Sequence, residues 1–214
     1  IMKNLSYIKK RIKNILRIVI QFKKIINNPA PIYAKRTEGI KLHLGSGNIN
    51  LQGWINIDAR EGSNVHILEK DFKLETFSDN SISEIYLCHV LEHFTLNEIE
   101  NLLVIFSKKL LIGGVLRISV PNFDNILKIY QLSDNNIDKI RPILLGGQDH
   151  IYNFHKSIFN TKNLTKLLTK NNFGYIEEWN TKEIFGSDIG DYSNHNVRIS
   201  NQKIPISLNL SGQL

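Results

Sequence analysis

The chain has very little cysteine. Cys88 is the one thiol among 214 residues. A lone thiol excludes an internal disulfide and a site in which two cysteines share a metal, so we expect the protein to work in a reducing compartment. The rest of the composition, with 42% hydrophobic and 22% charged residues, is typical of a globular protein. The length suffices for one well-buried domain with an appendage.

Long apolar runs are missing as well. No uncharged hydrophobic stretch approaches the roughly 18 residues that a membrane span requires, and no small-residue cleavage site follows the N-terminal segment. We therefore expect neither a transmembrane helix nor a signal peptide, and we expect the protein in the cytoplasm.

Acidic residues are absent from positions 1–36, which contain ten Lys or Arg residues. The whole chain has 27 basic and 20 acidic residues, so positions 37–214 hold 17 basic against 20 acidic residues, a net charge of about −3. The basic excess therefore belongs to an N-terminal arm, residues 1–36, and not to the binding face of a domain. We expect two parts: this basic arm and a globular domain over residues 37–214.

The basic arm has the apolar period of an amphipathic helix. Apolar side chains recur mostly at three- and four-residue steps, at Leu5, Ile8, Ile12, Ile15, Leu16, Val19, Phe22 and Ile26. The segment 27–31, Asn-Asn-Pro-Ala-Pro, ends the helix as a linker. Two interpretations stay open. The helix lies on the anionic inner leaflet of the membrane as a peripheral attachment, or its apolar stripe packs on the domain, on the second subunit of a homodimer or on a partner enzyme.

Two glycines end a strand-like run that begins at Ile40. The segment 43–48 reads His-Leu-Gly-Ser-Gly-Asn, and glycines here let backbone N–H groups approach a ligand. A dinucleotide site needs a third glycine where Asn50 stands, and no Gly-Lys-Ser/Thr follows, which excludes a phosphate-binding P-loop. Asp58 ends the next strand-like run, where an acid can accept hydrogen bonds from a ribose diol. These residues predict a site for a nucleoside ligand without phosphates.

Four segments in this order resemble the class I S-adenosylmethionine-dependent methyltransferases, and more closely the small bacterial branch associated with surface-glycan synthesis. They are LHLGSG, GWINIDA, FSDNSISEIYLCHVLEHF and GGQDHIYNFHKSIFN, and the resemblance covers roughly residues 41–210. It implies S-adenosyl-L-methionine as the cofactor. For residues 37–214 it implies a Rossmann-like α/β methyltransferase sandwich with a mostly parallel sheet.

The hydrophobic pattern of the domain alternates between strands and helices. We expect strands over 42–44, 54–58, 65–68, 85–88, 115–120, 175–179 and 204–210, and helices over 96–111, 123–132 and 161–170. Thr95 and Glu98 form a capping box for the first of these helices, and Gly113-Gly114 is expected to stop it. Only six residues, 48–53, separate the first two strands, although a parallel crossover usually needs a dozen or more. Either the first helix is a single turn or the second strand is misplaced.

The resemblance implies how the cofactor lies against the domain. The backbone of Gly45, Ser46 and Gly47 is implied to contact the methionine part, and Asp58 to accept hydrogen bonds from the ribose hydroxyls. Asp71 and Phe72 are implied to contact the adenine, and His89 to lie beside the reacting methyl group. These positions converge because ligands of α/β sheets lie beyond the carboxyl ends of the strands. The family usually has an acid where His43 stands, to hold the cofactor's ammonium group. The partner of that ammonium group therefore stays unassigned.

Methyl transfer from a sulfonium to a hydroxyl needs a group that removes the hydroxyl proton, a role that histidine fills near neutral pH. We assign it to His150, because Asp149 precedes it and Gly146-Gly147 gives the loop a hinge. His93 and His155 are alternative candidates, and a structural role for each histidine also stays open. A divalent metal on Asp149, His150 and His155 would need a fourth ligand that the sequence does not offer, so we expect no metal.

Two motifs of other methyltransferase classes are missing. Enzymes that methylate amino groups of bases and of glutamine carry Asn/Asp-Pro-Pro-Tyr/Phe after the fourth strand, where the segment 88–91 reads Cys-His-Val-Leu. The Pro-Cys nucleophile of cytosine C5 chemistry is also missing. Oxygen methylation is therefore favoured, and carbon methylation stays open.

Three functional hypotheses result. The leading one is O-methylation of a sugar hydroxyl in a bacterial surface glycan or in its lipid-linked precursor. The second is methylation of RNA or of a small metabolite, although the arm up to Ile26 offers only Tyr7 and Phe22 to stack on bases, which disfavours nucleic acid. The third is a non-catalytic cofactor-fold partner of another glycan enzyme.

Overall fold

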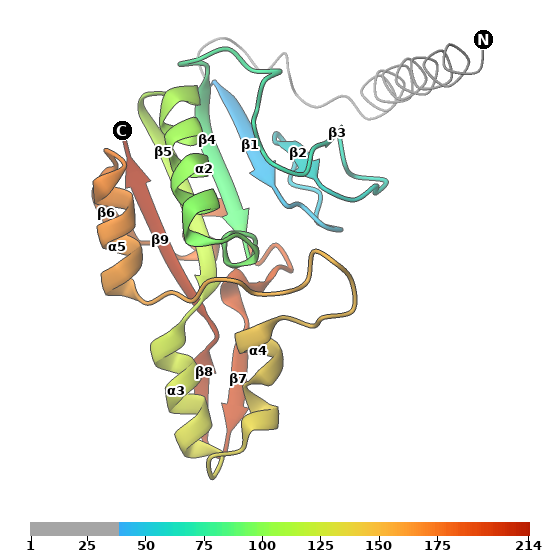
Figure 1. Ribbon diagram of the computed structural model, residues 1–214, viewed down its shortest axis with the longest axis vertical. Helices are drawn as coiled ribbons and strands as arrows, with labels where there is room; N and C mark the ends of the chain where they lie inside the picture. The colour runs from blue at the N-terminus through green and yellow to red at the C-terminus, as the bar shows by residue number, and fades with distance from the viewer. Residues whose placement is uncertain (1–38) are drawn as a thin grey trace, which may run out of the picture.

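The structure, a computed structural model, describes residues 39–214, and its centre is a seven-stranded sheet (Figure 1). In spatial order the strands are β3 (Ile67–Leu68), β2 (Ile55–Asp58), β1 (Ile40–Leu44), β4 (Ile82–Cys88), β5 (Leu110–Pro121), β9 (Ser207–Gln213) and β6 (Gly174–Glu178). The first five are parallel, and β9 runs antiparallel between β5 and β6. The mostly parallel α/β sheet expected from the sequence is confirmed. The helix predicted within the basic arm lies outside the described residues.

One face of the sheet is apolar and carries two helices, α2 (Leu96–Lys109) and α5 (Thr161–Lys170). Alternate side chains of the strands point to this face, as the two-residue period of a strand requires. The helices contribute Ile99, Leu102, Leu103, Phe106, Leu164 and Leu168 to the shared core. Both helices begin with a capping box, Thr95 with Glu98 and Asn160 with Asn163, which satisfies free backbone N–H groups of the first turn. The capping box predicted at Thr95 is thus confirmed.

The predicted end of the helix over 96–111 is wrong by two residues. Helix α2 ends at Lys109, and Leu110 already pairs with Ile82 of β4. Gly113 and Gly114 therefore lie inside β5, where the pairing register between the two strands shifts. A glycine pair can end a helix or allow an irregular strand, and pairing with β4 decides between these outcomes.

Strands β1 and β2 are joined without a helix. Residues 45–54 contain turns, and Leu51 and Trp54 are buried against Tyr86 and Trp179 on the second face of the sheet. The strand expected over 54–58 is confirmed as Ile55–Asp58, parallel to β1. The single-turn helix considered for this crossover is absent from the described chain, and large apolar side chains of the turn cover the sheet in its place.

A small subdomain lies beyond the carboxyl ends of the parallel strands (Figure 1). It consists of α3 (Phe123–Leu132), α4 (Arg141–Leu145) and the hairpin of β7 (Asn196–Ile199) with β8 (Gln202–Pro205), which share a separate isoleucine-rich core. The single strand predicted over 204–210 is therefore wrong, because β8 ends at Pro205 and β9 begins at Ser207 in the other sheet.

The other expected elements agree with the structure to different degrees. The helices over 123–132 and 161–170 are confirmed residue for residue. The strand over 65–68 is shorter, and the strand over 85–88 begins three residues earlier, at Ile82. The remaining short elements are η1 (Leu91–His93), η2 (Ile137–Lys139), α6 (Thr181–Phe185) and η3 (Tyr192–Asn194). None of the helices within residues 39–214 is long and apolar enough to cross a membrane.

Candidate functional site

The carboxyl ends of β1, β2 and β4 meet at one edge of the sheet. The turn Gly45–Gly47 follows β1, Asp58 is the last residue of β2, and His89 follows β4. Ligands of open α/β sheets bind at this edge. The structure thus brings the predicted cofactor residues of three strands to a common edge.

The glycine turn at 45–47 is shaped by close backbone packing. Gly45 has a positive φ of 66°, and a Cβ on it would overlap Val90, which follows β4. The Gly45 and Ser46 amides both donate to the Ile57 carbonyl, at 2.8 and 3.2 Å. Only glycine at position 45 therefore lets the turn pack closely against Val90, because any larger residue would overlap that side chain.

The same turn leaves room on its other side. Gly47 has a φ of 51°, and a Cβ built on it would meet no atom within 4 Å. Ser46 Oγ is buried yet has no hydrogen-bond partner within residues 39–214. An open space beside an unsatisfied hydroxyl fits a bound polar ligand, because a buried polar group normally has a partner.

Asp58 ties the glycine turn to the end of β2. Its side chain is nearly buried; Oδ2 accepts a hydrogen bond from the Gly47 amide and Oδ1 from the Arg60 amide, each at 2.8 Å. A carboxylate offers about four acceptor positions, so the two backbone contacts leave capacity for hydroxyl donors. Asp58 is thus held in place while it stays able to accept from a diol.

Asp71 and Phe72 lie past β3 in different environments. Asp71 is exposed, whereas the Phe72 ring is 3% exposed and packs against Phe94, with the ring centroids 6.0 Å apart. The Asp71 carboxylate is therefore available to a ligand, and Phe72 offers only backbone. Their contact with adenine stays a prediction.

His43, which stands where the family has an acid, is buried and uncharged at neutral pH. Its Nδ1 donates to Asn56 Oδ1 at 3.2 Å, and its ring stacks on Tyr86. Burial lowers the pKa of His43 to about 4, against the opposing effects of the Asn56 hydrogen bond and of the Asp191 and Asp58 charges. Asp191, which sequence reasoning missed, accepts a hydrogen bond from the Tyr86 hydroxyl.

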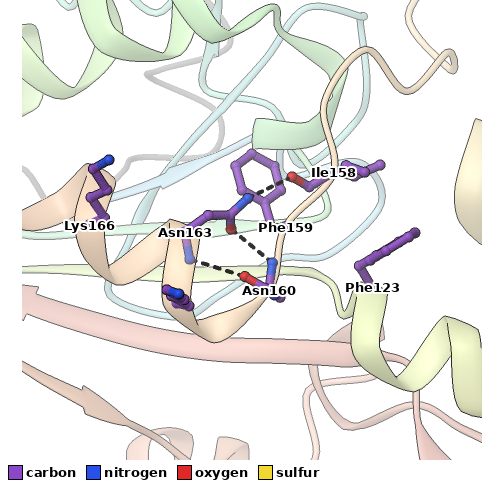
Figure 2. A pocket seen from close by; sticks show the side chains of 7 residues that line it. Phe123, Ile158, Phe159, Asn160, Asn163 and Lys166 are labelled. Atoms are coloured by element: carbon purple, nitrogen blue, oxygen red, sulfur yellow. Dashed lines mark hydrogen bonds between the residues drawn. The ribbon is translucent and has the colours of Figure 1, made fainter.

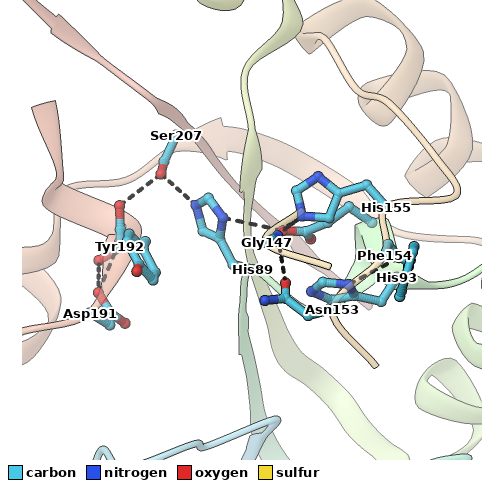
Figure 3. Close-up of polar contacts among 11 residues, drawn as sticks. His89, His93, Gly147, Asn153, Phe154, His155, Asp191, Tyr192 and Ser207 are labelled. Carbon is cyan, nitrogen blue, oxygen red and sulfur yellow. Dashed lines mark hydrogen bonds and ion pairs between the residues drawn. The ribbon is translucent and has the colours of Figure 1, made fainter. Parts of the chain in front are cut away.

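His89 sits where β4 ends, in a left-handed conformation with a φ of 52°. Figure 3 shows its ring between Ser207 and the loop that carries His155. The Ser207 hydroxyl donates to the Tyr192 carbonyl at 2.7 Å, so towards His89 Nε2, 2.8 Å away, it acts as the acceptor. This assigns the Nε2 proton to His89 and directs Nδ1 at Glu92, whose Oε1 is 3.2 Å away.

Glu92, in η1, is completely buried and is surrounded by His89, His93 and His155. Burial alone would raise the pKa of Glu92, but His89 first, and then His93 and His155, lower it below its ordinary value. His155 Nε2 lies 3.9 Å from Glu92 Oε1, and the rings of His93 and His155 meet edge to face. Sequence reasoning missed Glu92, although an acid between Leu91 and His93 at the start of a short helix was a visible signal.

His150 and Asp149 lie in a different environment from His155. His150 Nε2 is 3.1 Å from Nη1 of Arg60 and 3.8 Å from Oδ1 of Asp149. A guanidinium only donates, and the Tyr152 amide faces His150 Nδ1 at 3.2 Å, so a neutral His150 can accept from one of these two donors but not from both. The Asp149 carboxylate accepts a hydrogen bond from the side-chain amide of Asn153, which lowers the pKa of the Asp149 carboxyl. The predicted grouping of His150 with His155 is thus divided: one histidine lies beside Arg60 and the other beside Glu92.

A hollow of about 400 Å³ lies near the start of α5, away from the glycine turn (Figure 2). Its lining combines apolar side chains with amides and ammonium groups: Phe123, Ile158, Phe159, Asn160, Lys162, Asn163 and Lys166. Phe123 and Ile158 also border His155 in a smaller recess. The hollow and the Glu92 cluster are therefore neighbours.

No family model and no curated protein matches the chain. Solved structures with the same fold do match. A SAM-dependent methyltransferase from Archaeoglobus fulgidus is 14% identical with a TM-score of 0.51, over 92% of this chain and 94% of that one. A SAM-dependent methyltransferase from Thermotoga maritima, described as a possible histamine N-methyltransferase, is 12% identical with a TM-score of 0.51, over 95% and 96%. The chain therefore has the α/β fold of class I methyltransferases.

Proposed function

We propose that the protein is an S-adenosylmethionine-dependent methyltransferase that methylates a sugar hydroxyl of a bacterial surface glycan or of its lipid-linked precursor. The observation that carries the proposal is the glycine turn 45–47 held by Asp58 at the carboxyl edge of the sheet. In this fold, that edge binds ligands. The glycan acceptor rests on the resemblance of the four sequence segments.

The cofactor, when bound, would supply an electrophilic methyl group. The residues around the glycine turn offer a contact for each part of it. The space beside Gly47 receives the methionine part, and Ser46 Oγ gains a partner there. Asp58 accepts the ribose hydroxyls with its remaining lone pairs, and the exposed Asp71 carboxylate accepts from the adenine amino group.

Asp191 is our candidate partner for the cofactor's ammonium group. Its charge acts on His43 at the end of β1, and its carboxylate accepts from Tyr86 on the adjacent β4. An uncharged His43 cannot attract a cation, whereas a carboxylate beside it can. The acid that is missing from β1 is in this way supplied by Asp191, the N-cap residue of η3.

His150 is our candidate for the group that takes the acceptor proton. Its Nε2 lies 3.1 Å from Nη1 of Arg60, so that contact must open before Nε2 can receive a proton from an acceptor.

Calorimetric titration with S-adenosylmethionine tests cofactor binding. Replacement of Asp58 by Ala should weaken binding by about 1.5–3 kcal/mol, the range for hydrogen bonds to a charged group. Asp58→Asn, which keeps one acceptor oxygen, should lose less. Asp138→Ala, on the distant and exposed η2, is the control and should bind like the parent chain. Unchanged affinity of Asp58→Ala would remove this residue from the site.

Transfer of a labelled methyl group to lipid-linked oligosaccharide tests the acceptor. Label in the oligosaccharide, stable to base and absent when the acceptor is omitted, is the expected result. Cofactor binding without label in the oligosaccharide, but with label in RNA or in a small metabolite, would favour the second hypothesis. Cofactor binding without transfer to any of these acceptors would favour a non-catalytic partner of a glycan enzyme.

A further inference from the structure

Glu92, His93 and His155 bring three metal-binding groups together. One ligand atom from each side chain lies within 4.8 Å of the others. Figure 3 shows two of the three, His93 and His155, side by side. Glu92 and His93 come from η1, directly after β4, whereas His155 comes from the loop before α5, more than sixty residues later in the chain. The fold therefore assembles this cluster from segments that the sequence keeps apart.

The buried Glu92 carboxylate has imidazoles as its polar neighbours. Its side chain is 0% exposed; His89 Nδ1 makes an ion-pair contact with Oε1 at 3.2 Å, and no other described residue donates a hydrogen bond to either oxygen. Burying an ionised carboxylate without hydrogen bonds costs several kcal/mol, so a native protein compensates such a group with a positive charge or a metal. The Glu92 carboxylate oxygens lie among the histidines and not at a surface.

The neighbouring imidazoles are oriented as metal-binding histidines are. His93 Nδ1 donates to the Phe154 carbonyl at 3.2 Å, which leaves Nε2 with a free lone pair. His89 donates from Nε2 to Ser207, and its Nδ1 lies 3.2 Å from Glu92 Oε1. In metal sites one ring nitrogen binds the ion while the other donates to a carbonyl or another fixed acceptor, and this arrangement selects the tautomer.

From this geometry we infer that Glu92, His93 and His155 bind a divalent transition-metal ion of the zinc class, with His89 as the adjacent candidate for a fourth ligand. Two imidazoles and a carboxylate suit Zn²⁺, Co²⁺ or Fe²⁺, whereas Mg²⁺ and Ca²⁺ prefer oxygen ligands alone. Tetrahedral ligands at about 2.0–2.1 Å from zinc are roughly 3.4 Å apart, so binding draws the three side chains closer together.

This set differs from the metal-binding group weighed in the sequence. Asp149 and His150 face solvent and Arg60, and His155 alone belongs to both sets. The inference concerns metal binding and holds whether or not the protein transfers a methyl group.

Titration of the untagged, chelator-treated protein with Zn²⁺ tests the site, with Co²⁺ as a spectroscopic probe. We expect one equivalent of Zn²⁺ to bind in competition with a chromophoric chelator, and Co²⁺ to develop the visible absorption of a four- or five-coordinate ion. Glu92→Gln, His93→Ala and His155→Ala should each weaken Zn²⁺ binding by at least about tenfold, since even residues that only orient ligands contribute that much.

His150→Ala is the matched control, because it removes a histidine of the same loop that lies outside the cluster. It should bind Zn²⁺ like the parent chain. If Glu92→Gln fails to fold, the less buried His93 carries the test, with circular dichroism to verify its fold. Absence of stoichiometric Zn²⁺ binding by the parent chain, or binding that His93→Ala and His155→Ala leave unchanged, would overturn the inference.

Discussion

The missing side chain of Gly45 decides how closely the turn after β1 approaches the segment after β4. A methyl group there would overlap Val90, whereas two residues later Gly47 faces open space. Both glycines have a positive φ, so the two positions share the backbone cost of an L side chain and differ in their surroundings. Gly45 therefore has a structural role, whereas Gly47 faces the space in which we propose that the ligand binds.

Gly45→Ala should destabilise the protein by about 2–4 kcal/mol, which combines backbone strain with overpacking against Val90. Gly47→Ala should cost only about 1–2 kcal/mol through backbone strain, while its methyl group weakens cofactor binding. Urea unfolding and calorimetric titration measure the two effects. Equal stability losses, or unchanged cofactor affinity in Gly47→Ala, would contradict this division.

His43 makes stability depend on pH. The pKa of His43 is about 4 in the folded chain, against 6.5 for an unperturbed histidine, so between these values the unfolded chain binds more protons. Stability is therefore complete above pH 6.5 and is lost as the pH falls towards 4, by about 3 kcal/mol for this group. Burial also lowers the pKa of His66, which acts in the same direction.

Urea unfolding at several pH values checks this prediction with His43→Asn. The variant should be less stable at pH 7 because it loses the stacking on Tyr86, yet its stability should change less between pH 6.5 and 4. A slope as steep as that of the parent chain would assign the pH dependence to other groups.

His150→Ala should lower turnover by about 10²–10⁴-fold and leave cofactor affinity nearly intact, since general-base catalysis contributes that range. Arg60→Ala frees His150 Nε2 and should not produce the same loss. Steady-state rates and cofactor titration, measured side by side, decide the matter. Near-normal turnover of His150→Ala would leave its loop with a role in positioning the acceptor.

At the scale of elements, the start of α2 supports the Glu92 cluster. The Thr95 side chain accepts from the Glu98 amide, and the Glu98 carboxylate accepts from the Thr95 amide, which lowers the pKa of the Glu98 carboxyl. Only Phe94 separates η1 from this cap. The cap therefore helps to fix the direction of the backbone just after the buried Glu92.

Thr95→Ala should lower the free energy of unfolding by about 1 kcal/mol, the usual effect of removing an N-cap side chain. It should also weaken the binding of Zn²⁺ at Glu92. Asn160→Ala in α5, which removes the other capping box, is the comparison, because it should lower stability similarly. Urea unfolding provides the measurement. An unchanged unfolding midpoint in Thr95→Ala would show that tertiary packing alone holds α2 in place.

At the scale of the whole molecule, the charge is unevenly distributed: ten basic residues lie in the arm 1–36, and residues 37–214 are slightly acidic. We expect the full chain to float with phosphatidylglycerol vesicles at low salt and to detach as ionic strength rises, because salt screens the attraction. A shortened chain beginning at Ala34 should stay in solution.

Equal flotation of the two chains would exclude the arm as the membrane anchor. If neither chain floats and a salt-insensitive oligomer disappears on shortening, the apolar stripe packs between subunits. Sedimentation at both salt concentrations distinguishes these outcomes.

Local patterns in the sequence were enough to predict several of the elements and the glycine turn. The helices over 123–132 and 161–170 follow from apolar period and capping residues that act within a few positions. The turn at Gly45 and the placement of Asp58 at the end of β2 follow in the same way, because parallel strands end at one edge.

Only the tertiary structure decided which side chains meet. Gly113-Gly114 became part of β5 through pairing with β4, and the strand over 204–210 divided because its halves pack on different cores. Glu92 and His155 meet through long-range packing, whereas His150, five residues before His155, turns to Arg60. Sequence spacing restrains neighbours along one element, but burial and ion pairing between distant loops depend on how the whole chain packs.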